Sequence, residues 1–354
     1  MICPHCWQSI IESDFSHPES DHKNDSKLLC PSCEHDLPEN YLSASQHIIS
    51  ILGAPCSGKS YFLPVHLKEL KDSLYYKYGC FLRRANENTM VVQCITEEIY
   101  ELGKPLMATT LDGFTYQQIN GESNPIPFIY TLKTPSVSQE HNLVFYDQFG
   151  GAYLPWMERK TETQFASGII FLFDPFRHYG FRRSMLKYSD DIDPQYEFPV
   201  TEGDDDDPNS TFSYKGQLNS LNKALLNTPQ TNHKKVPIAF VVGKYDAWQG
   251  LAQSYFPTSN YFSDPREDSG LNTSTIQNNS NNLRALVGNV DPQIVKDVES
   301  LAGSVTYFPL SIFGEPPSRP EGEDFQVPVP MKPFQVDVPM LWMIHRFAPE
   351  LVSV

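Results

Sequence analysis

The stretch HIISILGAPCSGKS, residues 47–60, decides the fold of this chain. Its first half is a short apolar run rich in isoleucine, which is typical of a buried strand. Its second half, residues 53–60, fits the pattern G-x-x-x-x-G-K-[ST], and a helical pattern continues through Leu70. Glycines let the backbone turn its N–H groups onto phosphate oxygens, and the start of the following helix favours negative charge. We therefore expect a phosphate-binding loop between a strand and a helix.

Two residues of this loop have individual roles. The ammonium group of Lys59 would reach the β- and γ-phosphates of a nucleotide, and the hydroxyl of Ser60 would bind Mg²⁺. The whole expected phosphate site comprises Gly53, Ala54, Pro55, Cys56, Ser57, Gly58, Lys59 and Ser60.

Two aspartates are candidates for the acid that holds Mg²⁺. The segment NLVFYDQFGG places Asp147 at the end of an apolar strand, and Gly150 completes an Asp-x-x-Gly pattern. Asp147 would hold Mg²⁺ through water, and the N–H of Gly150 would sense a γ-phosphate. Asp174 ends the apolar run GIIFLFD in the same way, as the acid of an ATPase would. We prefer Asp147, because only this aspartate is followed by the glycine.

Further apolar runs predict the remaining strands of an α/β fold. They lie at residues 128–132, 142–147, 168–174, 237–243 and 305–311. Strands this apolar, separated by helical or loop stretches, favour a mostly parallel sheet covered on both faces. A helix is expected over 338–347. The stretches 181–235, with its GDDDDPNS run, and 253–296, rich in Asn and Ser, read as insertions on the surface.

The segment PIAFVVGKYDAW ends a predicted strand in Gly243, Lys244, Tyr245 and Asp246. It resembles the guanine-reading [NT]-K-x-D motif of Ras-like and translation-factor GTPases. In that family the aspartate accepts two hydrogen bonds from guanine, which adenine cannot supply. The resemblance implies that Asp246 reads the base and that the stem of Lys244 packs on it. Gly243 departs from the family pattern, because it removes one side chain that tethers the loop.

Other segments follow the same family order over residues 47–350. Ser311 and Ile312 in YFPLSIFG resemble the S-A-[KL] loop near the base, and Thr109, or else Thr110, falls where the switch I threonine should lie. The chain looks closest to divergent GTPases of prokaryotic conflict and regulatory systems, including the double-GTPase type. The resemblance implies GTP or GDP and Mg²⁺ as ligands of a P-loop GTPase domain over residues 47–354. Gly151 stands where many of these GTPases carry a water-orienting glutamine, which implies slow or partner-stimulated hydrolysis.

The first 40 residues read as a separate zinc ribbon. They contain two C-x₂-C pairs 23 residues apart, formed by Cys3, Cys6, Cys30 and Cys33. Four thiolates at this spacing suit a tetrahedral Zn²⁺, and so small a module needs the metal to fold. His5 and His35 are possible alternates. Residues 1–46 hold two lysines against eight acids, which favours a structural or protein-docking role over nucleic-acid binding.

Composition limits the partners that we expect. The chain has 43 acidic and 27 basic residues and a formal net charge of −16, so it would repel nucleic acid and anionic membrane surfaces. The sequence shows no secretory signal and no apolar run long enough to cross a membrane, and we expect a cytoplasmic protein with reduced cysteines.

Three functions follow from these patterns. The first is a Mg²⁺-dependent GTPase that acts as a switch, whose state is read by protein partners through the ribbon and the insertions. The second is an ATPase that uses Asp174. The third is a nucleotide-binding scaffold with little turnover, which Gly151 favours.

Overall fold

A computed structural model gives the fold of most of the chain. The residues that it describes are 1–11, 15, 28–54, 57–106, 116–119, 122–147, 162–188, 213–226, 236–256, 258, 261–268, 270–301, 303–318 and 326–352.

A seven-stranded sheet forms the centre of the molecule, in the order β13-β10-β9-β3-β8-β7-β4. Its strands are β3 (Ser45–Gly53), β4 (Phe81–Arg84), β7 (Phe128–Thr134), β8 (Val137–Asp147), β9 (Gly168–Phe173), β10 (Val236–Val242) and β13 (Gly303–Pro309). Neighbours from β13 to β8 run parallel, whereas β7 pairs antiparallel with both β8 and β4. The predicted α/β fold with a mostly parallel sheet is confirmed, and the antiparallel edge is a feature that the sequence did not predict.

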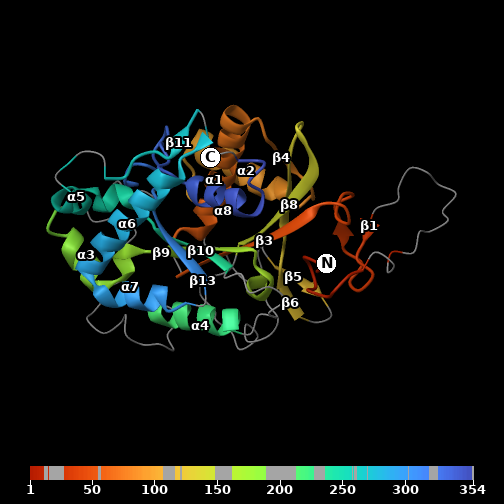
Figure 1. Cartoon of the computed structure of the whole chain (residues 1–354), viewed down its shortest axis with the longest axis horizontal. Helices are drawn as coiled ribbons and strands as arrows, with labels where there is room; N and C mark the ends of the chain where they lie inside the picture. Colours follow the sequence, from red (N-terminus) through yellow and green to blue (C-terminus); the bar gives the residue numbers. More distant parts are fainter. Residues whose placement is uncertain are drawn as a thin grey trace.

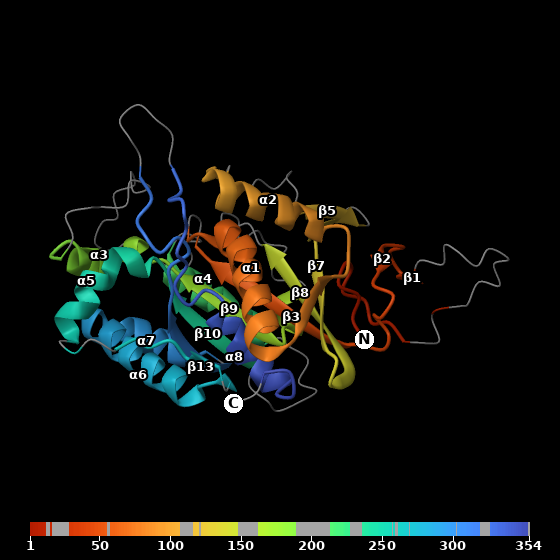
Figure 2. The same cartoon turned by 90° about the horizontal axis from the view of Figure 1, so that it is seen from above.

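Helices cover both faces of this sheet. Above it in Figure 1 lie α1 (Lys59–Tyr78), α2 (Thr89–Leu102) and α8 (Val338–Phe347). The opposite face packs against α3 (Tyr179–Met185), α4 (Tyr214–Leu226), α5 (Tyr245–Tyr255), α6 (Thr273–Val290) and α7 (Pro292–Glu299). Figure 2 shows the same layers from above, with α1 lying along the sheet near β3.

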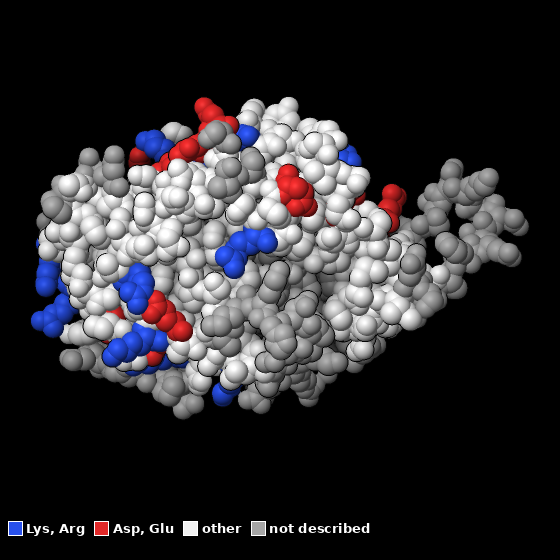
Figure 3. All heavy atoms as spheres, viewed as in Figure 1, with Lys and Arg blue, Asp and Glu red and all other residues white. Residues whose placement is uncertain are grey.

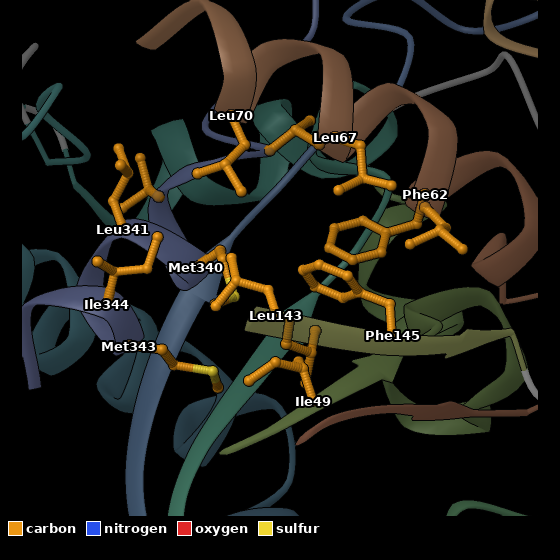
Figure 4. Close-up of a cluster of buried hydrophobic side chains, with 14 of the residues drawn as sticks. Ile49, Phe62, Leu67, Leu70, Leu143, Phe145, Met340, Leu341, Met343 and Ile344 are labelled. Atoms are coloured by element: carbon orange, nitrogen blue, oxygen red, sulfur yellow. The ribbon is translucent and has the colours of Figure 1, made fainter. Parts of the chain in front are cut away.

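The larger core lies between the sheet and the pair α1 and α8 (Figure 4). Phe62 of α1 and Met340 and Ile344 of α8 point toward Leu143 and Phe145, which are alternate residues of β8. All five side chains are completely buried. Burying an apolar side chain of this size stabilises the fold by roughly 1.5–3 kcal/mol, so this cluster fixes α1 firmly over the sheet.

The prediction that residues 253–296 form an insertion on the surface is wrong for part of this stretch. Residues 273–290 form helix α6, which begins with the side chain of Asn272 accepting a hydrogen bond from the N–H of Thr275. Leu283, Leu286 and Val287 of this helix are completely buried in the core under β10. The many Asn and Ser residues lie mostly on the other faces of the helix, where they masked its apolar stripe in the sequence.

The N-terminal module also departs from the prediction, because it is not separate from the sheet. It contains the short antiparallel pair β1 (Leu28–Leu29) and β2 (Asp36–Leu37). The side chain of Trp7 packs with Ile48 of β3, Ile129 of β7 and Tyr146 of β8 in a common buried cluster. In Figure 1 the module, in red, lies beside β3 and β8. The cysteine-rich module therefore covers part of the sheet face opposite to α1 and α8.

A buried ion pair holds the start of α8. The short hairpin of β11 (Arg266–Glu267) and β12 (Gly270–Leu271) places the guanidinium of Arg266 2.9 Å from the carboxylate of Asp337, which is completely buried. The hydroxyl of Ser73 donates to the same carboxylate. Burial raises the pKa of Asp337 even with Arg266 beside it.

None of the helices in the described part of the chain is both long enough and apolar enough to cross a membrane.

Candidate functional site

The carboxyl ends of the parallel strands meet at one edge of the sheet, and the predicted phosphate loop lies in the middle of this edge. Strand β3, which leads into the loop, has β8 on one side and β9 on the other. The chain thus changes direction across the sheet at β3, and ligands of open α/β sheets bind at such a point. The register pairs Ile51 with Asp147 and Gly53 with Leu172, so both candidate acids end strands next to the loop.

Close packing explains the two glycines of the loop. A Cβ on Gly53 would lie 2.6 Å from the carbonyl oxygen of Leu172 and 2.7 Å from the hydroxyl of Ser57, so no side chain fits. Gly58 has a φ of 91°, in the left-handed region that favours glycine, and it precedes the first residue of α1. Gly58 is therefore required by the local backbone conformation, and Gly53 by its close approach to Leu172 of the neighbouring strand β9.

Polar groups of the loop point inward. The ammonium of Lys59 is buried and donates to the carbonyl oxygens of Gly53 and Ala54, at 2.8 and 2.7 Å. The hydroxyl of Ser57 is buried and has no hydrogen-bond partner among the described residues. A buried donor without a partner is costly, and a phosphate oxygen would satisfy it. Ser60 is the second residue of α1, whose positive end faces the loop.

The predicted base-reading residues come together beside the phosphate loop. Lys244 lies in the left-handed region, with a φ of 57°, and immediately precedes α5, so that Asp246 is in the first turn of the helix. The hydroxyl of Ser311 donates to the carboxylate of Asp246. A Cβ on Gly58 would lie 3.1 Å from the Cδ1 atom of Ile312, which shows that the loop after β13 contacts the phosphate loop. The three segments therefore form one continuous site.

A cavity of about 600 Å³ opens next to this base loop. Asp246 and Ser311 belong to its lining, and the polar side chains of Gln249 and Gln253 continue it along α5. The cavity is therefore a continuation of the predicted base site.

The carboxylate of Asp174 contacts a backbone N–H and a lysine ammonium. Its side chain accepts a hydrogen bond from the N–H of Phe176 at 3.1 Å and lies 3.3 Å from the ammonium of Lys244. The carboxylate is completely buried, and the lysine ammonium lies 5.2 Å from the centre of the Phe176 ring. These contacts hold the predicted base-site lysine beside Asp174. Sequence reasoning missed the pair, because only the adjacency of β9 and β10 brings the two residues together.

Gly243 leaves room for the side chain that the resemblance would require. Its N–H donates to the carbonyl oxygen of Phe173 at 3.0 Å, and the indole N–H of Trp248 donates to its carbonyl oxygen at 2.7 Å. A Cβ at this position would meet only the Phe173 oxygen, at 3.6 Å, which is an ordinary contact. The glycine is therefore not imposed by lack of space.

Several predicted site residues cannot be placed by the structure. Pro55, Cys56, Thr109, Thr110 and Gly150 lie outside the described residues, as does Gly151. Asp147 is the last residue of β8, and only its backbone position is described.

The four predicted zinc ligands converge in the N-terminal module. Their sulfur atoms all lie within 4.8 Å of one another, with Cys3 and Cys33 at 3.8 Å and Cys6 and Cys30 at 3.9 Å. A tetrahedral zinc site with Zn–S bonds of about 2.3 Å separates its sulfurs by about 3.8 Å, so the four thiols fit this ion. The hydrogen bond between Cys3 and Cys6 lowers the pKa of Cys6 and, together with burial, raises the pKa of Cys3.

The two histidines near the cluster have other contacts. Their rings stack, with centres 4.8 Å apart, and the Nδ1 atom of His35 lies 2.9 Å from the carbonyl oxygen of Cys33. Among the described residues, the group of possible metal ligands here consists of the cysteines alone.

The surface charges give no sign of a nucleic-acid interface on the face drawn in Figure 3. The described Lys and Arg side chains on that face lie in separate places, with acidic side chains among them. This distribution agrees with the negative net charge of the chain.

Comparison with known proteins does not assign this chain to a family. No family model and no curated protein matches the chain. Among solved structures, sup35 complexed with GDP aligns over 80% of this chain and 41% of its own, with 10% sequence identity and a TM-score of 0.27. The chain thus spans less than half of that protein. So low a score carries no argument about function, and the site is interpreted from its own geometry.

Proposed function

We propose that this protein is a Mg²⁺-dependent GTP-binding switch with slow or partner-stimulated hydrolysis. The observation that carries the proposal is the contact of three strand-end segments at one edge of the sheet. The phosphate loop, the base loop with Asp246, and the loop of Ser311 and Ile312 are joined by the contacts at Gly58 and Asp246. A nucleotide spanning them would place its phosphates on α1 and its base on α5.

Each predicted residue has a chemical role in such a complex. Backbone N–H groups of the loop and the ammonium of Lys59 would bind the phosphates, after Lys59 exchanges the carbonyl oxygens of Gly53 and Ala54 for phosphate oxygens. Ser60 and Asp147 are the residues that would hold Mg²⁺. The ion, when bound, neutralises charge on the phosphates.

Guanine selection would depend on Asp246. Its carboxylate can accept the two hydrogen bonds that guanine donates, and the hydroxyl of Ser311 fixes its orientation. Lys244, held by Asp174, would pack its stem on the base. Adenine supplies neither of these two hydrogen bonds, so the carboxylate would lose water on binding without gaining the partners that guanine provides.

The base site is tested by nucleotide titration. Fluorescent GDP, ADP and xanthosine diphosphate are titrated in Mg²⁺ against the wild-type protein, the Asp246→Asn variant and the exposed control Asp268→Asn. We expect a preference for GDP in the wild type and in the control, and a change to xanthosine diphosphate in Asp246→Asn. Equal or tighter binding of ADP by the wild type would overturn guanine recognition and favour the ATPase.

Turnover is a separate question from binding. Hydrolysis of GTP is measured with the protein alone and with candidate partner proteins added. We expect a slow intrinsic rate and an increase with the right partner, because a partner can supply the water-orienting side chain that the glycine at position 151 does not provide. Tight GTP binding without turnover under any of these conditions would favour the scaffold.

A further inference from the structure

Strand β4 is one end of the central sheet, and within the described part of the chain its outer edge has no partner strand. On the inner side it pairs antiparallel with β7, in a register that places Arg84 opposite Tyr130. The N–H of Ala85, next in the chain, donates to the carbonyl oxygen of Ile129, so Ala85 is directed at β7. Backbone groups of an antiparallel strand point to its two sides in alternation. The N–H and C=O groups of Leu82 and Arg84 therefore point outward, where another strand could pair with them.

Basic side chains stand along this edge. Arg83 and Arg84 are consecutive residues of β4, so their side chains point to opposite faces of the sheet. Both residues are exposed. A strand that paired with the edge would therefore meet a guanidinium group on each of its faces. This is a local concentration of positive charge on a chain whose formal net charge is −16.

Exposed apolar side chains flank the two ends of the strand. At its start the ring of Phe81 packs against the ring of Tyr75 of α1, with centres 5.6 Å apart, and Tyr75 in turn contacts Tyr76. These two tyrosines are 50% and 79% exposed. At the other end Met90 of α2, which is 48% exposed, contacts the guanidinium of Arg84. An exposed apolar residue by itself is ordinary, but these gather beside outward-pointing backbone groups, as a peptide-binding edge requires.

The charges decide which kind of strand this edge accepts. Pairing with the same edge of a second copy would bring arginines opposite or diagonal to arginines, and like charges in these positions destabilise a strand pair. A strand with acidic side chains at these positions forms ion pairs with Arg83 and Arg84 instead. We propose that the outer edge of β4 binds an extended acidic segment of a partner protein, which adds to the sheet as an eighth strand. The inference is independent of the proposed function, because the edge belongs to no part of the nucleotide site.

Binding is measured with the full chain and a short fluorescent peptide of valine and threonine that carries two adjacent glutamates at its centre. Adjacent glutamates place one carboxylate on each face of the added strand, as the two arginines require. We expect this peptide to bind about tenfold more tightly than the same peptide with two lysines, and its affinity to fall as salt is added. Methylation of the peptide nitrogens that would face β4 should abolish binding, because it removes the donors of the new ladder.

Amide hydrogen exchange distinguishes strand addition from a contact of side chains alone. The N–H groups of Leu82 and Arg84 should exchange more slowly when the glutamate peptide is bound, because they then donate to its carbonyl oxygens. The N–H of Arg83 is already directed at β7, so its exchange should change little.

Matched variants assign the charge preference to the edge. Arg83→Glu combined with Arg84→Glu should invert it, so that the lysine peptide binds more tightly than the glutamate peptide. The control combines Arg183→Glu with Lys187→Glu, which changes the net charge equally at two exposed positions in and just after α3. This control should keep the preference of the wild type. Thermal unfolding checks that both double variants are folded.

Three results would overturn the proposal. Equal binding of the two peptides, or binding of neither, would rule out selection of an acidic strand at this edge. Binding of the glutamate peptide without slower exchange at Leu82 and Arg84 would rule out strand addition. Slow exchange at these two amides that increases with protein concentration, in the absence of peptide, would show that a second copy of the chain occupies the edge. Since no nucleotide is added, none of these results bears on GTP binding.

Discussion

Replacing Asp174 by asparagine tests whether this acid positions the base-site lysine or holds a metal. The substitution keeps the size of the side chain, and its amide oxygen can still accept the hydrogen bond from Phe176. It removes the negative charge 3.3 Å from the ammonium of Lys244. Because the side chain of Asp174 is completely buried and that of Lys244 is 17% exposed, water screens this pair only weakly.

The size of the effect follows from the kind of bond that is lost. A hydrogen bond to a charged group contributes about 1.5–3 kcal/mol. If the interaction of Asp174 with Lys244 keeps the lysine in the position that binds the base, losing it weakens GDP binding by roughly ten- to a hundredfold. We expect the affinity for GDP to fall within this range, and the dependence of binding on Mg²⁺ to stay as in the wild type.

The assay is a titration with fluorescent GDP in Mg²⁺ and in EDTA, for Asp174→Asn and for the matched variant Asp147→Asn. The Asp147 variant should show the opposite pattern, with its affinity in EDTA unchanged and the gain from Mg²⁺ lost. Thermal unfolding of both variants checks that they are folded. Wild-type GDP affinity in EDTA together with loss of the Mg²⁺ effect in Asp174→Asn would refute the positioning role and restore Asp174 as the metal acid.

Three further predictions concern the loop glycines and the buried ion pair. Gly53→Ala should abolish nucleotide binding in a folded protein, because its methyl group would lie 2.6 Å from the carbonyl oxygen of Leu172; retained GDP binding in the titration would contradict this. Gly243→Asn should be tolerated and should raise GDP affinity severalfold, since a Cβ fits there and the resemblance expects a tethering amide; weaker binding would argue against the base-loop interpretation. Arg266→Ala should lower the free energy of unfolding by about 3–5 kcal/mol, because it leaves the completely buried carboxylate of Asp337 without its cation. Burial already raises the pKa of Asp337, so the folded Arg266→Ala variant holds the proton on Asp337 more tightly than the unfolded chain does. The stability of this variant should therefore fall as pH rises above 3.8, the ordinary pKa of an aspartate, and adding Asp337→Asn should remove the fall. Denaturant unfolding at several pH values measures this, and a stability that does not change with pH would show that the carboxylate is solvated.

Local patterns in the sequence were sufficient for the strands and for the phosphate loop. The predicted strand at 168–174 is β9, completely buried over Gly168–Phe173, because a run of this kind can only be placed between two helical layers. The glycine at 58 follows from backbone geometry within a few residues, whereas the close approach of Gly53 to Leu172 is a contact between neighbouring strands. The converging cysteines likewise follow from a spacing that suits one small ion. The helix α6 escaped prediction, since its buried leucines are spread among polar residues.

The sequence by itself thus determined the strands, the phosphate loop and the cysteine cluster, because each is marked by a short motif or by a run of apolar residues. Only the tertiary structure decided which acid faces Lys244, because that contact depends on β9 lying next to β10. It also decided that Trp7 packs against Tyr146 and Phe165, which are both more than a hundred positions away in the chain. Such pairs are selected by the packing of whole elements against one another, and no local pattern of residues records which surfaces will meet.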